Sequence, residues 1–137
     1  MRSFFNEAEE TGAEQSEKGH ILVVDDSAIV LRNIKGILDK NYSVAVAPSG
    51  VHAFMSIGKK MPDLILLDYE MPEMNGRQVF EKLQEEEELK DIPVVFLTSV
   101  DSAEIVMSLL TLKPAGYLLK PVDSRLLLNK IRETIGK

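Results

Sequence analysis

Short runs of apolar residues alternate along this chain with longer segments whose apolar positions recur at helical spacing. The five short runs are residues 21–24, 42–47, 64–67, 93–97 and 115–120. They are almost continuously apolar, which is typical of strands in a sheet that is covered on both faces. The segments between and after them predict five amphipathic helices. This order predicts an α/β fold, in which a five-stranded parallel sheet carries helices on both faces.

Polar residues and glycines set the predicted helix ends. Ser27 and Asp123 precede the first and last helices and are suited to cap them. Gly58 and the following segment "KKMPD", residues 59–63, are expected to end the second helix. The third helix begins after Gly76 and runs into the acidic residues 85–88, which we interpret as its solvated end. All five helices therefore have plausible boundaries in the sequence itself.

The fourth predicted helix, residues 101–112, is apolar on more than one side. Its large apolar residues are Ile105, Val106, Met107, Leu109, Leu110 and Leu112. One interpretation is a surface that binds a second copy or an effector. The other is a helix that is buried more deeply than its neighbours. The sequence does not separate the two.

Composition narrows the classes of protein. The 137 residues suffice for one domain, and the absence of cysteine excludes disulfides and zinc–thiolate sites. The longest apolar runs fall far short of the roughly 18 residues that a membrane span needs. With no signal peptide either, we expect a cytoplasmic protein. The net charge of −6 argues against direct nucleic-acid binding.

The N-terminal residues differ from the rest of the chain. Residues 1–19 contain five acidic and two basic residues and few apolar ones, which predicts an acidic flexible tail or linker before a folded domain of residues 20–137. Phe4 and Phe5 could dock on some surface that the sequence does not identify. We favour the simpler interpretation, in which the tail is unbound.

Polar residues follow four of the five predicted strands. Asp25 and Asp26 end the first strand, Asp68 follows the third, Thr98 the fourth, and Lys120 lies at the end of the fifth. The carboxyl ends of parallel strands share one edge of a sheet, where such folds bind ligands. One aspartate there is more often a helix cap than a catalyst. Three carboxylates together repel one another and favour a cation, for which Mg²⁺ is suited.

This set of residues could perform phosphoryl chemistry. A carboxylate beside Mg²⁺ can attack phosphorus and form an acyl phosphate, and Asp68, after the central strand, is the best candidate nucleophile. Mg²⁺ and Lys120 would neutralise the phosphoryl oxygens, and the hydroxyl of Thr98 could hydrogen-bond the product.

Four segments together resemble a known family. The segments "ILVVDDS", "MPDLILLDYEMPEMNG", "PVVFLTS" and "GYLLKP" are similar, in order and spacing, to those of the receiver domain of two-component response regulators. The resemblance covers residues 20–135. It implies a flavodoxin-like (βα)5 fold, doubly wound, with strand order 2-1-3-4-5.

The resemblance also implies a role for each acidic residue. Asp68 would accept a phosphoryl group from a sensor histidine kinase or a histidine phosphotransfer protein. Mg²⁺ or Mn²⁺ would be held by Asp26 directly, by Asp25 through water, by Asp68, and by the backbone carbonyl of Glu70. The domain would be a phosphoacceptor rather than an enzyme.

The same resemblance implies a switch. Lys120 would pair with the phosphoryl group and Thr98 would move to hydrogen-bond it, while the Tyr117 side chain turns inward. The peptide bond between Lys120 and Pro121 would be cis. The readout surface would comprise the fourth helix, the fifth strand and the last helix, where an effector, an output domain or a second copy could bind.

Three positions differ from the commonest receiver pattern. Ser99 follows Thr98 where alanine is usual. Glu70 stands two residues after Asp68, where its side chain could tune loss of the phosphoryl group. Residues 113–114 are Lys-Pro where the family often has Gly-Ala, which affects the expected geometry of the fourth helix but not the phosphoacceptor.

Two other functions are alternatives to a phosphoacceptor switch. A receiver-like scaffold could bind partners without phosphorylation, although such proteins usually lack one of the site residues, and this chain has all of them. A Mg²⁺-dependent phosphatase of the haloacid dehalogenase type would need an aspartate two residues after its nucleophile, where this chain has Glu70. The sequence does not decide whether the domain acts alone or as part of a larger protein.

Overall fold

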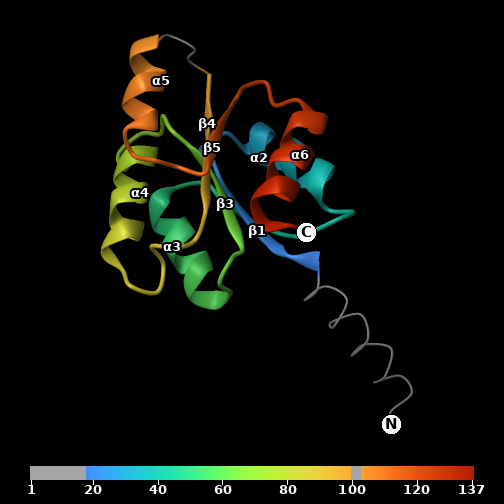
Figure 1. The fold of residues 1–137 in the computed structure, drawn as a ribbon. Helices are drawn as coiled ribbons and strands as arrows, with labels where there is room; N and C mark the ends of the chain where they lie inside the picture. The colour runs from blue at the N-terminus through green and yellow to red at the C-terminus, as the bar shows by residue number, and fades with distance from the viewer. Residues whose placement is uncertain (1–17, 100–102) are drawn as a thin grey trace, which may run out of the picture.

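The computed structural model describes residues 18–99 and 103–137. The strands are β1 (His20–Val24), β2 (Ser43–Ala47), β3 (Leu64–Asp68), β4 (Val94–Thr98) and β5 (Gly116–Leu119). The helices are α2 (Ala28–Leu38), α3 (Gly50–Lys59), α4 (Gly76–Glu85), α5 (Ala103–Leu110) and α6 (Ser124–Ile135). The strands form one parallel sheet in the order β2-β1-β3-β4-β5, which confirms the predicted topology (Figure 1).

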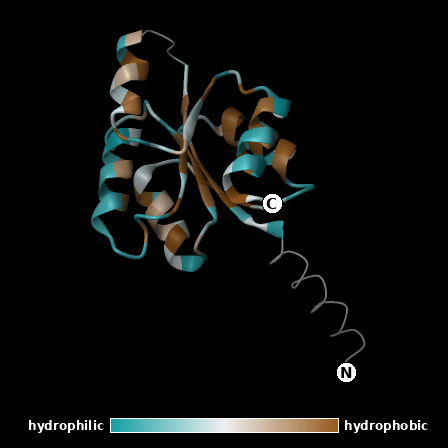
Figure 2. Ribbon diagram, viewed as in Figure 1, coloured by the Kyte–Doolittle hydropathy of each residue, from teal (hydrophilic) through white to brown (hydrophobic). Residues whose placement is uncertain are grey.

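Helices cover both faces of the sheet because the side chains of each strand alternate between two apolar cores. Leu22 and Val24 face α3, α4 and α5, whereas Ile21 and Val23 face α2 and α6. All residues of β1, β3 and β4 are buried. The sheet is accordingly an apolar layer between helices whose polar residues face outward (Figure 2).

The strand register brings the predicted site residues to one edge. Val24 pairs with Leu67, so Asp25 and Asp68 follow at the same level of the sheet. Thr98 pairs with Leu119, which places Lys120 one residue further along the same edge. This edge is the carboxyl end of the sheet, as the sequence predicts.

Helix caps explain why each helix starts where it does. Ser27 Oγ accepts a hydrogen bond from the Val30 amide, and an Asp123 carboxylate oxygen accepts from two amides of α6. Both caps confirm the sequence prediction. Asn75 forms a capping box with Gln78 at the start of α4.

The predicted boundaries agree with the structure only in part. The second predicted helix, α3, ends at Lys59, within the segment that was expected to end it. The third predicted helix, α4, ends at Glu85, and residues 86–91 form turns. Strand β4 is shifted by one residue from its predicted range, since Pro93 has no amide to donate to the ladder. Strand β5 is one residue shorter than predicted at each end. The tail prediction lies largely outside the described residues.

The fourth predicted helix is α5, and it is not deeply buried. Only Leu109 is buried among its described residues, while Met107 is 64% and Leu110 46% exposed. The interpretation of a deeply buried helix is therefore wrong. After this helix, Lys113 has a left-handed backbone (φ 57°), a conformation that glycine adopts more easily. Within the described residues, no helix is long and apolar enough to cross a membrane.

Candidate functional site

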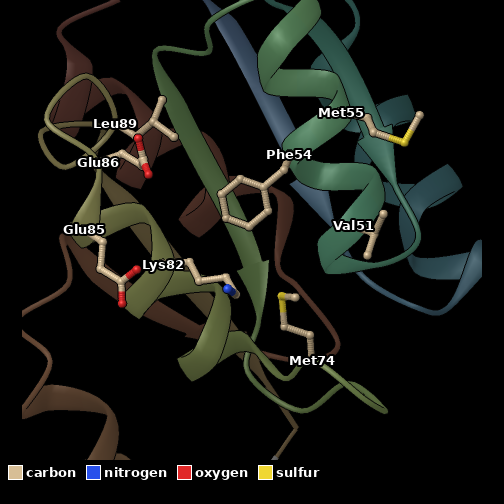
Figure 3. A pocket seen from close by; sticks show the side chains of 8 residues that line it. All are labelled: Val51, Phe54, Met55, Met74, Lys82, Glu85, Glu86 and Leu89. Atoms are coloured by element: carbon tan, nitrogen blue, oxygen red, sulfur yellow. The ribbon is translucent and has the colours of Figure 1, made fainter.

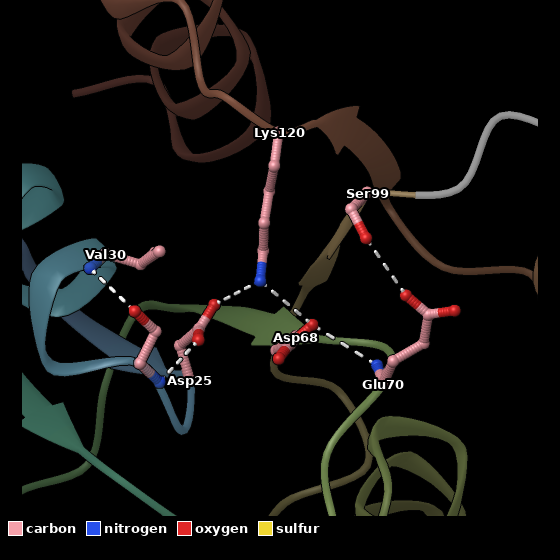
Figure 4. Close-up of polar contacts among 7 residues, drawn as sticks. Asp25, Val30, Asp68, Glu70, Ser99 and Lys120 are labelled. Carbon is pink, nitrogen blue, oxygen red and sulfur yellow. Dashed lines mark hydrogen bonds and ion pairs between the residues drawn. The ribbon is translucent and has the colours of Figure 1, made fainter.

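A partly buried lysine bridges two buried aspartates at the carboxyl edge of the sheet. The Nζ atom of Lys120 lies 2.7 Å from Oδ2 of Asp25 and 3.2 Å from Oδ1 of Asp68 (Figure 4). Asp25 is fully buried and Asp68 is 2% exposed, whereas the lysine side chain retains 19% exposure. Residues from β1, β3 and β5 thus meet in one ion-pair cluster, as the sequence predicts.

Backbone amides fix the orientation of both carboxylates. The amide of Ser27 donates to Oδ1 of Asp25 (2.9 Å), and the amide of Glu70 donates to Oδ1 of Asp68 (3.2 Å). Oδ2 of Asp25 has the Lys120 ion pair, but it accepts no hydrogen bond of good geometry from any described residue. Within the described residues, the compensation of this buried oxygen therefore rests on the Lys120 ion pair.

The electrostatics of the cluster disfavour two charged carboxylates. Burial, reinforced by the charge of Asp25, raises the pKa of Asp68 from 3.8 to about 6, although Lys120 opposes this shift. Burial alone would lower the pKa of Lys120, but its contacts with Asp25 and Asp68 raise it above the ordinary value. The lysine is charged, and it does not fully compensate the acids around it.

The acidic residues suit a divalent cation. Asp25, Asp26 and Asp68 each offer a carboxylate oxygen, and these oxygens lie within 4.8 Å of one another. Asp26 is exposed, so its side chain meets solvent at the mouth of the cluster. Three carboxylates against one ammonium, with a buried oxygen lacking a hydrogen bond, fit a hard cation that prefers oxygen ligands.

The predicted switch residues lie beside this cluster. Thr98 is fully buried at the end of β4, and its carbonyl accepts a hydrogen bond from the Lys120 amide (2.9 Å). Tyr117 is half-buried on β5 and packs against the core beneath α3, α4 and α5. The Lys120–Pro121 peptide bond is cis, as predicted.

Two of the unusual positions meet each other across the site. Ser99 Oγ donates a hydrogen bond to Oε1 of Glu70 over 3.4 Å (Figure 4). Both side chains are exposed. The loop after β3 and the loop after β4 are thus joined at the open side of the cluster.

Tyr69 was missed in the sequence, and it secures the loop that follows Asp68. Its amide donates to the Leu97 carbonyl (2.8 Å), and its ring packs edge-on against Phe96 with centroids 5.4 Å apart. The signal was an aromatic residue directly after the candidate nucleophile, but its partner on β4 depends on strand pairing. Gly76 closes the loop by donating its amide to the Tyr69 carbonyl (3.1 Å).

Glycine is required at position 76 by close backbone contact. A Cβ atom there would lie 2.2 Å from the Asp68 carbonyl oxygen and 2.7 Å from Cα of Tyr69. Such distances are well inside van der Waals contact. The start of α4 is therefore pressed directly against the backbone of the candidate nucleophile.

Comparisons with known proteins agree with this geometry. Residues 21–132 match the response regulator receiver domain family. The chain is 35% identical to two-component response regulator ORR5 of Oryza sativa, over 82% of this chain and 85% of that protein. It is 38% identical to a protein-glutamate methylesterase/protein-glutamine glutaminase of Trichodesmium erythraeum, over 77% of this chain but only 31% of that protein.

Solved structures show the same fold. The chemotaxis protein CheY4 of Vibrio cholerae superimposes with a TM-score of 0.78 at 28% identity, covering 84% of this chain and 97% of that one. The family match, the ORR5 similarity and this structural similarity lead to one conclusion. The chain belongs to the response regulator receiver domain family.

Proposed function

We propose that this chain is a phosphoacceptor switch, in which Asp68 receives a phosphoryl group from a sensor histidine kinase or a histidine phosphotransfer protein. The observation that carries this proposal is the Asp25–Lys120–Asp68 cluster at the carboxyl edge. It combines a carboxylate that can attack phosphorus with a fixed cation that can receive phosphoryl oxygens.

In the transfer step, a carboxylate oxygen of Asp68 forms a bond to phosphorus while the bond from phosphorus to the donor histidine nitrogen breaks. The nitrogen keeps that electron pair and takes up one proton from solvent. Asp68 becomes an acyl phosphate, and Lys120 balances the added charge.

A bound Mg²⁺ or Mn²⁺ would supply positive charge to the phosphoryl oxygens. Asp25, Asp26 and Asp68 would hold it, together with the backbone carbonyl of Glu70. Before transfer, the Glu70 amide and Lys120 keep Asp68 oriented at the edge of the sheet. The acid cluster supports this assignment because its charge is only partly compensated by lysine.

The new charge would bias a two-state element. Thr98 would hydrogen-bond the phosphoryl group, and Tyr117 would turn inward. The readout surface would be α5, β5 and α6, where large apolar side chains are exposed: Met107, Leu110, Leu119 and Leu126. An effector, an output domain or a second copy would bind this surface.

The scaffold and phosphatase alternatives agree less well with the site. A scaffold that is never phosphorylated would not need two buried aspartates around one partly buried lysine, an arrangement that is costly to maintain. A haloacid dehalogenase phosphatase would belong to another family, which the receiver family match contradicts. We therefore infer that the domain acts on its own phosphoryl group and not on a separate substrate.

The test is intact mass after incubation with acetyl phosphate, with Mg²⁺ or with EDTA. We expect one phosphoryl adduct that needs Mg²⁺, is labile at alkaline pH, and is absent from Asp68→Asn. Asp63→Asn is the matched control, because Asp63 lies at the opposite edge of the sheet and should leave the adduct unchanged. No adduct with acetyl phosphate or with donor kinases would support the scaffold alternative.

A further inference from the structure

An open apolar groove lies between α3 and α4, away from the α5–β5–α6 surface. Its volume is about 630 Å³ (Figure 3). The lining residues are Val51, Phe54, Met55, Met74, Lys82, Glu85, Glu86 and Leu89. The receiver chemistry described above uses none of these side chains.

The groove exposes more apolar surface than a helix pair needs for its own packing. Val51 and Met55, both on α3, are 60% and 57% exposed. Phe54, Met74 and Leu89 are half-buried and pack against the core below. A binding surface of this kind favours large apolar side chains, and methionines adapt to their shape.

Charged residues of both signs border the apolar surface. Lys82 projects from α4 toward the groove, and Glu85 and Glu86 lie at the end of the same helix (Figure 3). None of these three forms an ion pair with another residue in the described part of the chain. The nearby Lys90, by contrast, pairs with Glu87 at 3.0 Å.

We propose that the chain's own N-terminal segment, residues 2–7, docks in this groove with Phe4 and Phe5 on its apolar surface. The segment reads Arg-Ser-Phe-Phe-Asn-Glu and holds two of the five phenylalanines of the chain. Phenylalanine side chains bury large areas and suit apolar grooves.

The charges of the segment match the rim of the groove. Arg2 precedes the phenylalanines and can reach Glu85 and Glu86, while Glu7 follows them and can reach Lys82. Exposed ion pairs contribute little to affinity. Their role here is to fix the direction in which the segment lies, with its N-terminal end toward the end of α4.

The chain is long enough to make this contact. The 14 residue-to-residue steps from Phe5 to Gly19 span up to roughly 46 Å when extended, whereas a domain of this size has a radius of gyration of only about 13 Å. Strand β1 begins at the amino edge of the sheet, the edge at which α3 and α4 end (Figure 1). Because the contact is intramolecular, its effective concentration would be on the order of millimolar, so weak intrinsic affinity suffices.

Methionine methyl resonances provide the test. With ¹³C-labelled methionine methyl groups in the full chain, Met55 and Met74 would report ring currents from Phe4 and Phe5. We expect both signals to move in the Phe4→Ala/Phe5→Ala variant. Met61 and Met107, exposed outside the groove, are the internal controls and should stay in place. Unchanged Met55 and Met74 signals would overturn the proposal.

A second measurement separates the tail of the same chain from that of a second copy. The chain has no cysteine, so Ser3→Cys gives a single site for a nitroxide label. We expect the label to reduce groove amide signals by at least half in the labelled molecule itself. If the reduction occurs only when labelled protein is mixed with ¹⁵N protein carrying no label, or vanishes on dilution, the occupant is a second copy and the proposal fails. Neither result depends on phosphorylation of Asp68.

Discussion

The two ends of the sheet hold similar polar residues, but they satisfy them differently. At the amino end, the His20 amide donates to Oδ2 of Asp63 (2.7 Å), and Nδ1 of His20 lies 3.0 Å from Oγ of Ser43. At the carboxyl end, Asp25 and Asp68 share one lysine, and a buried oxygen of Asp25 has no hydrogen bond from a described residue. The polar groups at the amino end are paired with one another, whereas the carboxyl end retains excess negative charge.

This difference indicates that the carboxyl end of the sheet carries a cost in folding stability that the amino end does not. Buried charges without full compensation cost free energy, and they are common at functional sites. The raised pKa of Asp68 is the direct sign of that cost. If the comparison is right, changes at the two ends should shift stability in opposite directions.

The largest expected effect comes from Asp68→Asn in the absence of divalent cations. The neutral amide keeps a hydrogen-bond acceptor for Glu70 and leaves Lys120 paired with Asp25. We expect the free energy of unfolding at pH 8 to rise by about 3 kcal/mol, as follows from a carboxyl pKa raised by roughly two units. Urea denaturation with EDTA measures this, and a lower stability of the variant would contradict the comparison.

The stability difference between the wild type and Asp68→Asn should also depend on pH. Because the pKa of Asp68 is raised from 3.8 to about 6 on folding, the folded state binds the proton more tightly than the unfolded state. The wild type therefore loses stability as pH rises from about 4 to 6. We expect the advantage of Asp68→Asn to be near zero below pH 4 and complete above pH 7, and a pH-independent difference would rule out this cause.

Divalent cations should give the next largest effect. At a Mg²⁺ concentration 100 times the dissociation constant, the wild type should be more stable by about 2.7 kcal/mol. Asp68→Asn should respond less because it lacks one carboxylate of the cluster. Urea midpoints with MgCl₂ and with NaCl of equal ionic strength separate binding from screening, and equal responses would show that the acids do not form a site.

The amino end should behave in the opposite way. Asp63→Ala removes the acceptor for the His20 amide, and we expect a loss of about 1 kcal/mol that Mg²⁺ does not change. Asp63→Asn retains an acceptor oxygen and should be close to neutral. A stability increase from Asp63→Ala would mean that the polar residues at both ends of the sheet destabilise the fold.

The smallest effect is expected at the open side of the carboxyl end. Ser99→Ala removes an exposed 3.4 Å hydrogen bond to Glu70, so the free energy of unfolding should change by less than about 0.5 kcal/mol. Ser49→Ala, which removes the N-cap of α3, should cost about 1 kcal/mol in the same assay. A larger effect at Ser99 would place that contact among the stabilising ones.

Much of this arrangement was predictable from the sequence because strand ends are local features. Continuous apolar runs defined β1, β3 and β4, and the residues after them necessarily share one edge of a parallel sheet. The pairing of the Lys120 ammonium with both Asp25 and Asp68 was not predictable, since it depends on how side chains from three strands are placed relative to one another. The Tyr69–Phe96 contact and the groove between α3 and α4 were missed for the same reason: each depends on how separate elements pack.

The direct contact of Gly76 with the backbone of Asp68 has a consequence for how this chain tolerates mutation. Any side chain at position 76 must displace the residue that carries the candidate chemistry or displace the start of α4. A saturation library would therefore show position 76 depleted under selection for folding and under selection for signalling alike. Asp68, whose change to asparagine we expect to stabilise the fold, would be depleted mainly under the second. The two profiles would therefore distinguish a mechanical constraint from a chemical one.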